Sequence, residues 1–481
     1  MQHNNLVLNP PPKILHVRGF CAFTTEFNLA ELPRSPSLAL EYVTWLKDHN
    51  GRGAFSMDND CVAGQIPGLA KAYLKDAAKR GLVTETNFQR LYSMNNKHAF
   101  LDADGVVSLD PYTYIAWLLS NKGQTLYLTS TDLLRYALTQ PRFRPFVYDY
   151  FSSNPVKVVL RGEFQCDYGT APSPMSHEVA SQLFSFVKAT GTLVLPDVAT
   201  VTAASDKALK FPSQTSSCQY MVPLPKQLPF LLTTGTGNLL ATELPDILDR
   251  TKVAWDTEAW SPSGKLIFKP RFGNCGVGIL ITEEGEPTRN LHGEIVTDVK
   301  LEPGMDYVVQ PFVKTLYEKE LRYWVGPAIR GANQVGGPQK PQVFNQTLTA
   351  QEDGETTGVD AGRHDVGFQG PQEDQLYATA AQRVFKHFSD MVVEHSIRGN
   401  TGLQLPMRVD MFKHQGRVWV NEVDVYGTGE LWLSTLGHVK AGRDDLAIRA
   451  LAHHVRHKIT NWSDRTGGGN KRKRTTHPPP C

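Results

Sequence analysis

The stretch MRVDMFKHQGRVWVNEVDVYGTG, Met407 to Gly429, holds two strand-like runs joined by a turn at His414-Gln415-Gly416. Four charged residues stand where strands of this kind normally carry apolar ones: Arg408, Asp410, Glu422 and Asp424. Side chains alternate between the two faces of a strand. A hairpin across this turn therefore puts the even-numbered residues on one face, with Arg408 opposite Glu422 and Asp410 diagonal to it.

Three carboxylates and one arginine on a shared face need a further positive charge, because crowded and desolvated carboxylates repel one another. A hard divalent cation that carries phosphate would supply it, since Mg²⁺ takes one or two carboxylates plus phosphate oxygens. The alternative is a solvated outer face of an antiparallel sheet. The hairpin alone leaves both interpretations open.

Length and composition set the class of protein. The 481 residues are enough for two or three domains, and 41% hydrophobic with 20% charged residues is typical of a soluble globular chain. With 50 basic and 48 acidic residues the net charge is +2, which predicts no general affinity for nucleic acid or membranes. Six cysteines without a C-x-x-C pair indicate a reducing compartment.

These features predict a cytoplasmic location. No apolar run approaches the roughly 18 residues of a membrane span, and the N-terminus MQHNNLVLNPPPK lacks the pattern of a secretory signal. The basic run from Lys471 to Arg474 leaves two alternatives open, a solvated tail or a nuclear import or nucleic-acid contact.

The chain divides by pattern into five parts. A partly helical N-terminal region is followed by short β-rich runs that alternate with helix, then by many short strands, a helix and a tail that cannot bury a core. The boundaries we predict are 1–95, 96–196, 197–435, 436–461 and 462–481.

A second informative segment is KLIFKPRFGNCGVGILI, from Lys265 to Ile281. A strand ends in Lys269-Pro270, and a loop with three glycines (Gly273, Gly276 and Gly278) leads into another strand. Glycines let backbone amides approach phosphate oxygens, and a lysine adds a point charge. A dinucleotide or Walker loop must open a helix, so this strand–loop–strand pattern favours a flap over a triphosphate. An ordinary hairpin turn is the alternative.

A third segment runs from Asp306 to Val325, DYVVQPFVKTLYEKELRYWV, and reads as two apolar strands around a polar connection. Free backbone groups at Gln310 to Val313 could contact an adenine edge. A following carboxylate, Glu318 or Glu320, could hold a ribose. A solvated strand edge is the alternative.

In this order the segments resemble the ATP-grasp superfamily, which includes D-alanine–D-alanine ligase, glutathione synthetase and biotin carboxylase. The matching stretches are Ser205-Asp206-Lys207, Phe268-Lys269-Pro270, Gly273–Gly278, Val308–Val313, Glu320-Leu321-Arg322, Arg408-Val409-Asp410 and Asn421–Asp424. The sequence departs from the family at Asp424, where many members have Asn, and at Gln310, where Glu is frequent. Cys275 in the loop is also unusual.

The resemblance implies an α+β protein with an ATP-grasp fold, in which two α+β subdomains clasp ATP. A small α/β domain and the partly helical N-terminal region would precede it. It implies ATP binding by Lys207, Lys269, Gly273, Gly276, Gly278, Gln310, Phe312, Val313 and Glu320. It implies Mg²⁺, with Mn²⁺ as an alternative, on Asp410, Glu422 and Asp424.

The implied activity is that of a ligase joining a small-molecule or peptide carboxylate to an amine or thiol through an acylphosphate. Arg408 would stabilise the acylphosphate or the tetrahedral species, and Lys269 would act with it as a catalytic residue. Two alternatives stay open: a kinase that phosphorylates a hydroxyl, and a non-catalytic nucleotide-binding module. Many members are dimers, so a homodimer is also an expectation.

Overall fold

The fold is that of a computed structural model, which describes part of the chain. The described residues are 14–18, 25–28, 55–56, 68, 71–72, 75–76, 79, 106–109, 126–130, 136–153, 158–161, 185, 193–195, 206–208, 226–255, 264–272, 278–291, 293–313, 316, 320–327, 341–349, 371–395, 407–424 and 455–456. Apart from Val455 and Arg456, the predicted C-terminal helix and tail lie outside them.

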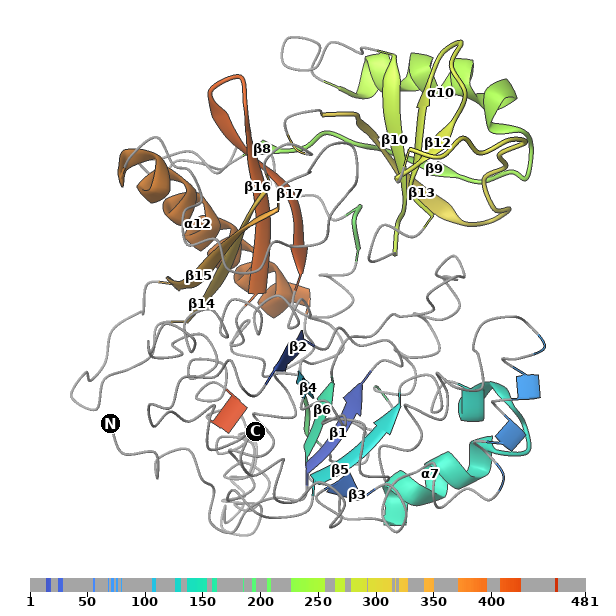
Figure 1. Ribbon diagram of the computed structural model, residues 1–481, viewed down its shortest axis with the longest axis vertical. Helices are drawn as coiled ribbons and strands as arrows, with labels where there is room; N and C mark the ends of the chain where they lie inside the picture. Colours follow the sequence, from blue (N-terminus) through green and yellow to red (C-terminus); the bar gives the residue numbers. More distant parts are fainter. Residues whose placement is uncertain are drawn as a thin grey trace, which may run out of the picture.

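The N-terminal half contains a parallel five-stranded sheet, in the lower part of Figure 1, with strand order β3-β5-β1-β6-β7. Its elements are β1 (Ile14–Arg18), β3 (Phe55–Ser56), β5 (Leu126–Ser130), α7 (Arg144–Ser153), β6 (Val158–Arg161) and β7 (Leu193–Leu195). Two further strands, β2 (Thr25–Asn28) and β4 (Val106–Leu109), form an antiparallel pair.

This sheet crosses the boundary predicted at residue 95. Strand β1 comes from the region predicted to be partly helical and separate, yet it lies between β5 and β6 at the centre of the sheet. A single run of five residues, Ile14 to Arg18, is too short to show a reliable strand period in sequence. The α/β unit therefore includes strands from both predicted regions.

The second unit is an antiparallel sheet of order β12-β11-β10-β13-β9 covered on one face by helix α10. Its elements are β9 (Leu231–Thr234), α10 (Leu240–Ala254), β10 (Lys265–Pro270), β11 (Leu280–Glu283), β12 (Arg289–Asn290) and β13 (Asp306–Pro311). Leu244 and Leu248 of α10 pack in one buried cluster with Phe268 and Val309 of the sheet.

The third unit is a sheet of order β15-β14-β16-β17-β8 with helix α12 beside it. Its elements are β8 (Lys226–Gln227), β14 (Glu320–Pro327), β15 (Pro341–Thr349), α12 (Pro371–His395), β16 (Met407–His414) and β17 (Arg417–Asp424). Strand β14 pairs antiparallel with β15 and β16, and β16 pairs antiparallel with β17. Strand β8 joins β17 in parallel. The predicted α+β class and its two helix-covered subdomains are confirmed.

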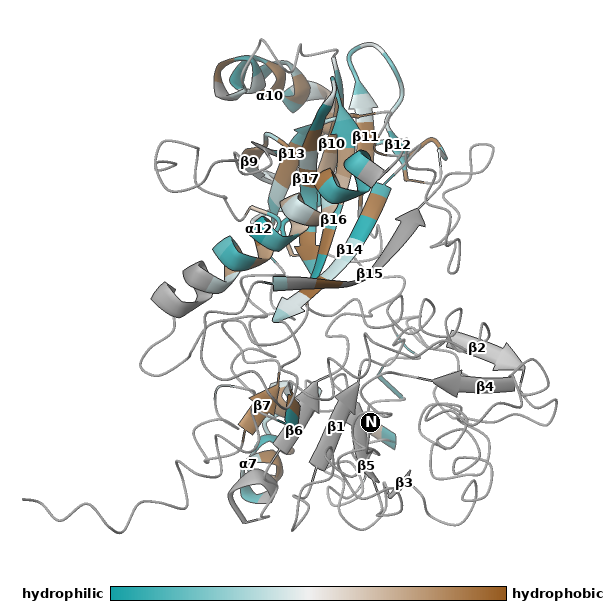
Figure 2. Ribbon diagram, turned by 90° about the vertical axis from the view of Figure 1, so that its left-hand side faces the viewer, coloured by the Kyte–Doolittle hydropathy of each residue, from teal (hydrophilic) through white to brown (hydrophobic). Residues whose placement is uncertain are grey.

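The second and third sheets each have one face that packs against a helix and an opposite face that points away from it. Cross-strand partners share a face, so Phe268 and Val309 face α10 while Lys269 and its partner Val308 face the opposite way. In the third sheet Tyr323 stacks on Tyr377 of α12. Its strand neighbours, one residue away, therefore point to the other face. Figure 2 shows apolar colour concentrated in these strands.

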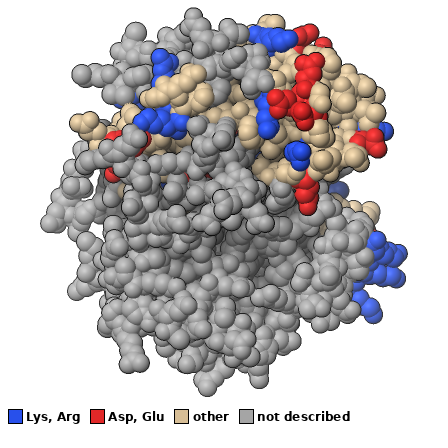
Figure 3. Space-filling view, turned by 45° about the horizontal axis from the view of Figure 1, so that its top comes forward, with Lys and Arg blue, Asp and Glu red and all other residues tan. Residues whose placement is uncertain are grey.

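Figure 3 shows both basic and acidic side chains on the described part of the face in view. Among the described helices, none combines the length and the apolar character that crossing a membrane requires.

Candidate functional site

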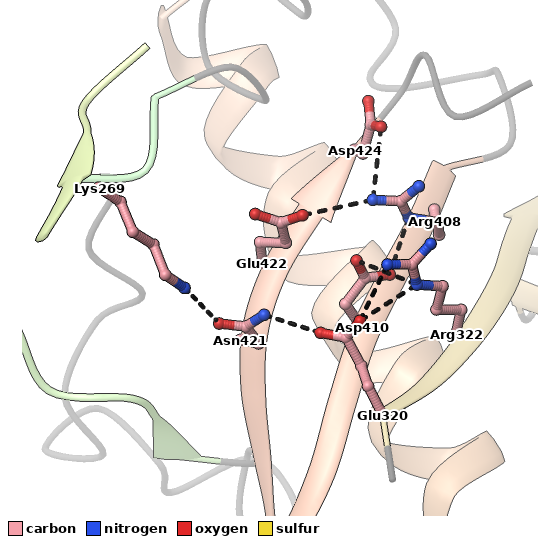
Figure 4. Close-up of polar contacts among 8 residues, drawn as sticks. All are labelled: Lys269, Glu320, Arg322, Arg408, Asp410, Asn421, Glu422 and Asp424. Carbon is pink, nitrogen blue, oxygen red and sulfur yellow. Dashed lines mark hydrogen bonds and ion pairs between the residues drawn. The ribbon is translucent and has the colours of Figure 1, made fainter. Parts of the chain in front are cut away.

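The candidate site lies where the two helix-free faces meet. Lys269 of β10 is buried, and its Nζ donates a hydrogen bond of 3.1 Å to Oδ1 of Asn421 on β17. Asn421 Nδ2 in turn donates to Oε1 of Glu320 on β14, at 2.7 Å. Figure 4 shows these contacts running from one sheet to the other. The predicted phosphate lysine and the predicted ribose carboxylate are thus linked through one asparagine.

Asn421 reaches this position because of a β-bulge. Asp410 pairs with Glu422 and Met411 pairs with Val420, so Asn421 is an extra residue on β17 with no partner on β16. A bulge re-aims side chains and is frequent beside active sites. The sequence argument did not include Asn421 among the site residues. Two consecutive polar residues, Asn421 and Glu422, break the alternation of the strand between Val420 and Val423, and they were the signal that could have revealed it.

The predicted pairing across the hairpin is wrong. Arg408 lies opposite Asp424, and Asp410 lies opposite Glu422. The turn has two residues, Gln415 and Gly416, both with positive φ. This is the geometry of tight two-residue hairpin turns. The shorter turn moves the register by one residue, and the bulge moves it by one more.

Arg408 occupies the centre of the predicted carboxylate cluster. Its Nε lies 2.8 Å from Oδ1 of Asp410, and its Nη2 lies 3.3 Å from Glu422 and 3.6 Å from Asp424. Figure 4 shows these ion pairs on the open face of β16 and β17. The three predicted metal ligands and the predicted catalytic arginine therefore form one cluster.

A second arginine, Arg322 of β14, joins this cluster and was not among the predicted site residues. Its Nη2 donates to Oε2 of Glu320 at 3.0 Å, and its Nε lies 3.8 Å from Asp410. Arg322 is two residues from Glu320 in the same strand, so both side chains share a face. That spacing was visible in the sequence.

Two buried ionisable groups have pKa values shifted in the direction that favours the neutral form. Burial raises the pKa of Asp410, and Arg408 and Arg322 offset only part of the rise. Burial also lowers the pKa of Lys269, against the opposing effect of Glu422. A cation beside the carboxylate and an anion beside the lysine would each favour the charged form. A metal ion with its phosphates supplies both.

Glu422 is shifted the other way. Burial alone would raise its pKa, but four surrounding cations lower it to about 2: Lys207, Arg408, Lys269 and Arg322. About a third of its side chain, 32%, is exposed. The Glu422 carboxylate is therefore ionised near neutral pH and accessible, as a metal ligand must be.

The donor groups fit a divalent ion held by two carboxylates. Both oxygens of Asp410 are buried and accept no directed hydrogen bond, although Oδ1 lies 2.8 Å from Arg408 and Oδ2 lies 3.8 Å from Arg322. Among the described residues, no three His, Cys, Asp or Glu side chains gather closely enough to hold an ion. Mg²⁺ needs only one or two carboxylates when phosphates complete its shell. Asp410 and Glu422 suit that role, and Asp424 as a third ligand stays a prediction.

The predicted Asp206-Lys207 element lies beside the end of β10. The Lys207 backbone N–H donates to the carbonyl oxygen of Arg271 at 3.0 Å. The positive charge of Lys207 lowers the pKa of both Lys269 and Glu422, so this side chain acts on the cluster electrostatically. The structure therefore brings Lys207 to the site.

The predicted adenine hinge contains one polar group that lacks a partner. Gln310 is 3% exposed, its Oε1 accepts no hydrogen bond, and it pairs across the sheet with Ile267 on the face of Lys269. The backbone is less free than predicted, because the Phe312 N–H donates to Lys265 and the Val313 carbonyl accepts from Leu316. These two groups already have partners within the described chain.

Side chains around the hinge also contact the rest of the fold. The Lys265 ammonium lies 4.6 Å from the Phe312 ring centroid. Val313 is buried in a small cluster with Phe412 and Trp419 of the third sheet. The hinge therefore packs directly against the strands that carry the charged cluster.

Of the three loop glycines, Gly278 is described and Gly273 and Gly276 lie outside the described residues. Gly278 has φ +71°, and an added Cβ would lie 3.0 Å from Cγ of Pro270. A side chain there is strained by both conformation and space. The loop therefore requires glycine where it returns to β11.

No family model matches the chain, and no curated protein matches it. Several solved structures match the chain. D-alanine–D-alanine ligase from Bacillus anthracis is 12% identical, with 80% of this chain and 96% of that chain covered and a TM-score of 0.41. D-cycloserine synthetase DcsG is 12% identical, with 70% and 90% covered and a TM-score of 0.39.

A RimK-domain ATP-grasp protein from Sphaerobacter thermophilus is 10% identical, with 62% of this chain and 81% of that chain covered and a TM-score of 0.34. The Sphaerobacter protein is described as an ATP-grasp protein. At these identities and scores, the chemistry has to be inferred from the side chains of the site itself.

Proposed function

We propose that this chain is an ATP-grasp ligase, which uses ATP and Mg²⁺ to join a carboxylate to an amine or thiol through an acylphosphate. The observation that carries the proposal is the meeting of Lys269 with the Asn421–Glu422 bulge between two sheets. One sheet contributes a buried lysine suited to phosphate, and the other contributes carboxylates suited to a metal ion.

Binding would use both sheets at once. Lys269 and Lys207 would hold phosphate oxygens as point charges, and the glycine loop would cover them. Gln310 would hydrogen-bond the base, because its buried Oε1 lacks a donor. Glu320 would accept hydrogen bonds from the ribose. Asp410 and Glu422 would hold Mg²⁺, which would supply positive charge against the negative charge that develops on phosphoryl transfer.

Two steps complete the reaction. A substrate carboxylate oxygen attacks the γ-phosphorus, the bond to the β-phosphate oxygen breaks, and ADP leaves. The amine nitrogen then attacks the acyl carbon, the C–O bond to phosphate breaks, and the amine proton passes to solvent. Arg408 lies beside the carboxylates with three donor nitrogens and would stabilise the negative tetrahedral species. Orientation and charge carry both steps.

The proposal is tested by measuring ADP and free phosphate released while amino acids and small acids are screened with amine acceptors. A ligase releases one ADP and one phosphate for each bond formed. Glu422→Gln and Asp410→Asn should lower this turnover by about 10²-fold or more, the scale of losing a group that stabilises the transition state. The surface variant Asp246→Asn on α10, whose side chain is 76% exposed, is the matched control.

The same assay separates the alternatives. A kinase releases ADP without free phosphate and leaves a stable phosphorylated product. A binding module shows no turnover with any substrate pair. Normal turnover by Glu422→Gln would contradict the metal assignment.

A further inference from the structure

Arg271, the first residue after β10, forms ion pairs with two aspartates, Asp206 and Asp306, and has none of the site roles described above. Its Nε and Nη2 each lie 2.8 Å from one oxygen of Asp206, and its Nη1 lies 3.1 Å from Asp306. All three guanidinium nitrogens are engaged. A bidentate pair of this kind is the strong, geometrically specific form of a charge-assisted hydrogen bond.

The backbone of Arg271 reinforces the same contacts. Its N–H donates to the carbonyl of Asp306 at 2.9 Å, and its carbonyl accepts the N–H of Lys207 at 3.0 Å. The Asp306 carboxylate also accepts a hydrogen bond from Thr234 of β9, at 2.7 Å. One residue thus fixes the end of β10, the start of β13 and the separate segment 206–208.

Segment 206–208, which Arg271 fixes, contains Lys207, whose ammonium is one of the charges that act on the site. Lys207 follows Asp206 directly, and its positive charge acts on Glu422 and Lys269. A lysine has a flexible four-carbon stem and loses side-chain entropy when it is held. Its backbone must therefore be anchored if the ammonium is to stay near the phosphates. The pair between Arg271 and Asp206 provides that anchor.

We propose that Arg271 is a positioning residue for nucleotide binding, which acts through Asp206 to hold Lys207 on the phosphates. The proposal rests on the proposed function, because it assumes that the site takes ATP. Lysine could not replace Arg271, since a single ammonium cannot form the planar fork with both Asp206 oxygens and reach Asp306 as well.

The test is a double-mutant cycle on Mg·ATP affinity, measured by calorimetry with the full chain. Arg271→Gln and Lys207→Met are made singly and together, and Arg250→Gln is the control. Arg250 forms an exposed ion pair with Asp246 on α10, at 3.6 Å, far from Lys207 in sequence. Thermal unfolding of every variant is recorded beside the affinity.

Each single variant should weaken ATP binding about 10-fold or more, the scale of one lost hydrogen bond to a charged group. The ATP affinity of the double variant should be at most about 2-fold lower than that of Lys207→Met, because Arg271 acts through Lys207. The control should bind like the native chain. If Arg271→Gln does not fold, Arg271→Lys takes its place in the cycle with the same expectation.

Three results would overturn the proposal. Losses that multiply in the double variant would make Arg271 a structural residue unrelated to Lys207. Native ATP affinity in Arg271→Gln, or in Arg271→Lys where it replaces Gln in the cycle, would remove its role while the proposed function stood. A native chain that binds no Mg·ATP would defeat both proposals together.

Discussion

Replacing Asn421 by alanine removes the side chain that links Lys269 of one sheet to Glu320 of the other by hydrogen bonds. The change breaks the hydrogen bond from Lys269 at 3.1 Å and the one to Glu320 at 2.7 Å. A hydrogen bond to a charged group contributes about 1.5–3 kcal/mol. Because water can reach part of this site, we take the lower end for each, which gives about 3 kcal/mol for the two.

That loss is measurable in two ways. A change of 1 kcal/mol shifts the melting temperature of a unit of 150–250 residues by about 2–4 °C, so Asn421→Ala should lower it by about 6–12 °C. ATP affinity should fall about 10-fold, because Lys269 loses the group that orients it. Asn421→Asp should bind ATP more weakly still, since it adds a negative charge beside the phosphates.

Asn290→Ala is the matched control, because Asn290 also donates to a glutamate, Glu294 at 2.6 Å, but on an exposed hairpin. Differential scanning calorimetry and isothermal titration with Mg·ATP supply the two readouts. Asn421→Ala would refute the bridging role if it melted and bound ATP as Asn290→Ala does. Tighter ATP binding by Asn421→Asp would refute the electrostatic argument.

Three further predictions concern the charge, the hinge and the packing of the site. Lys269 would bind phosphate only while protonated, and burial lowers its pKa below the ordinary 10.5. We therefore expect kcat/KM to fall as the pH rises through that lowered pKa. In Lys269→Arg this fall should disappear from the accessible pH range, because arginine stays protonated. A fall at the same pH in both proteins would contradict the assignment. Gln310→Met should raise the melting temperature, because the buried Oε1 of Gln310 accepts no hydrogen bond and an unsatisfied buried acceptor costs about 1–3 kcal/mol. The same change should weaken ATP binding, and unchanged affinity would remove Gln310 from the base contact. Phe388→Ala should lower the free energy of unfolding of the third unit by about 3–5 kcal/mol, because Phe388 is fully buried on α12. Leu376→Ala, whose side chain is 43% exposed, should lower it far less. Similar losses in the two variants would mean that Phe388 is not part of the core.

The sequence was most informative where charge interrupts an apolar strand. Asp410 and Glu422 were visible because burying a carboxylate in a sheet needs compensation. Lys269 was visible because it ends a strand before a glycine loop. The structure brings these three side chains together, whereas Arg322 and Asn421, which also contact them, were not among the predicted site residues.

Register could not be predicted in the same way. Each strand alternates with period two, so a one-residue slip exchanges its faces. The two-residue turn at Gln415-Gly416 and the bulge at Asn421 each add one such slip. At the bulge, Asn421 contacts Lys269 and Glu320, which come from distant parts of the chain. No local pattern contains that information.

Strand β1 was missed for a related reason. Its five residues become a strand because parallel partners on both sides, β5 and β6, satisfy its backbone. Parallel strands pair over long sequence separations, so the decisive contacts lie more than a hundred residues away. The Arg271–Asp206 pair is also non-local, because the two residues lie 65 positions apart in the chain.

Calorimetric titration of ATP into the native chain, with and without Mg²⁺, tests the central claim most directly. The account predicts ATP binding that strengthens when Mg²⁺ is present, and loss of that strengthening in both Asp410→Asn and Glu422→Gln, with Asp246→Asn unaffected. It would be contradicted by a native chain that binds no ATP, or by variants that keep the full effect of Mg²⁺.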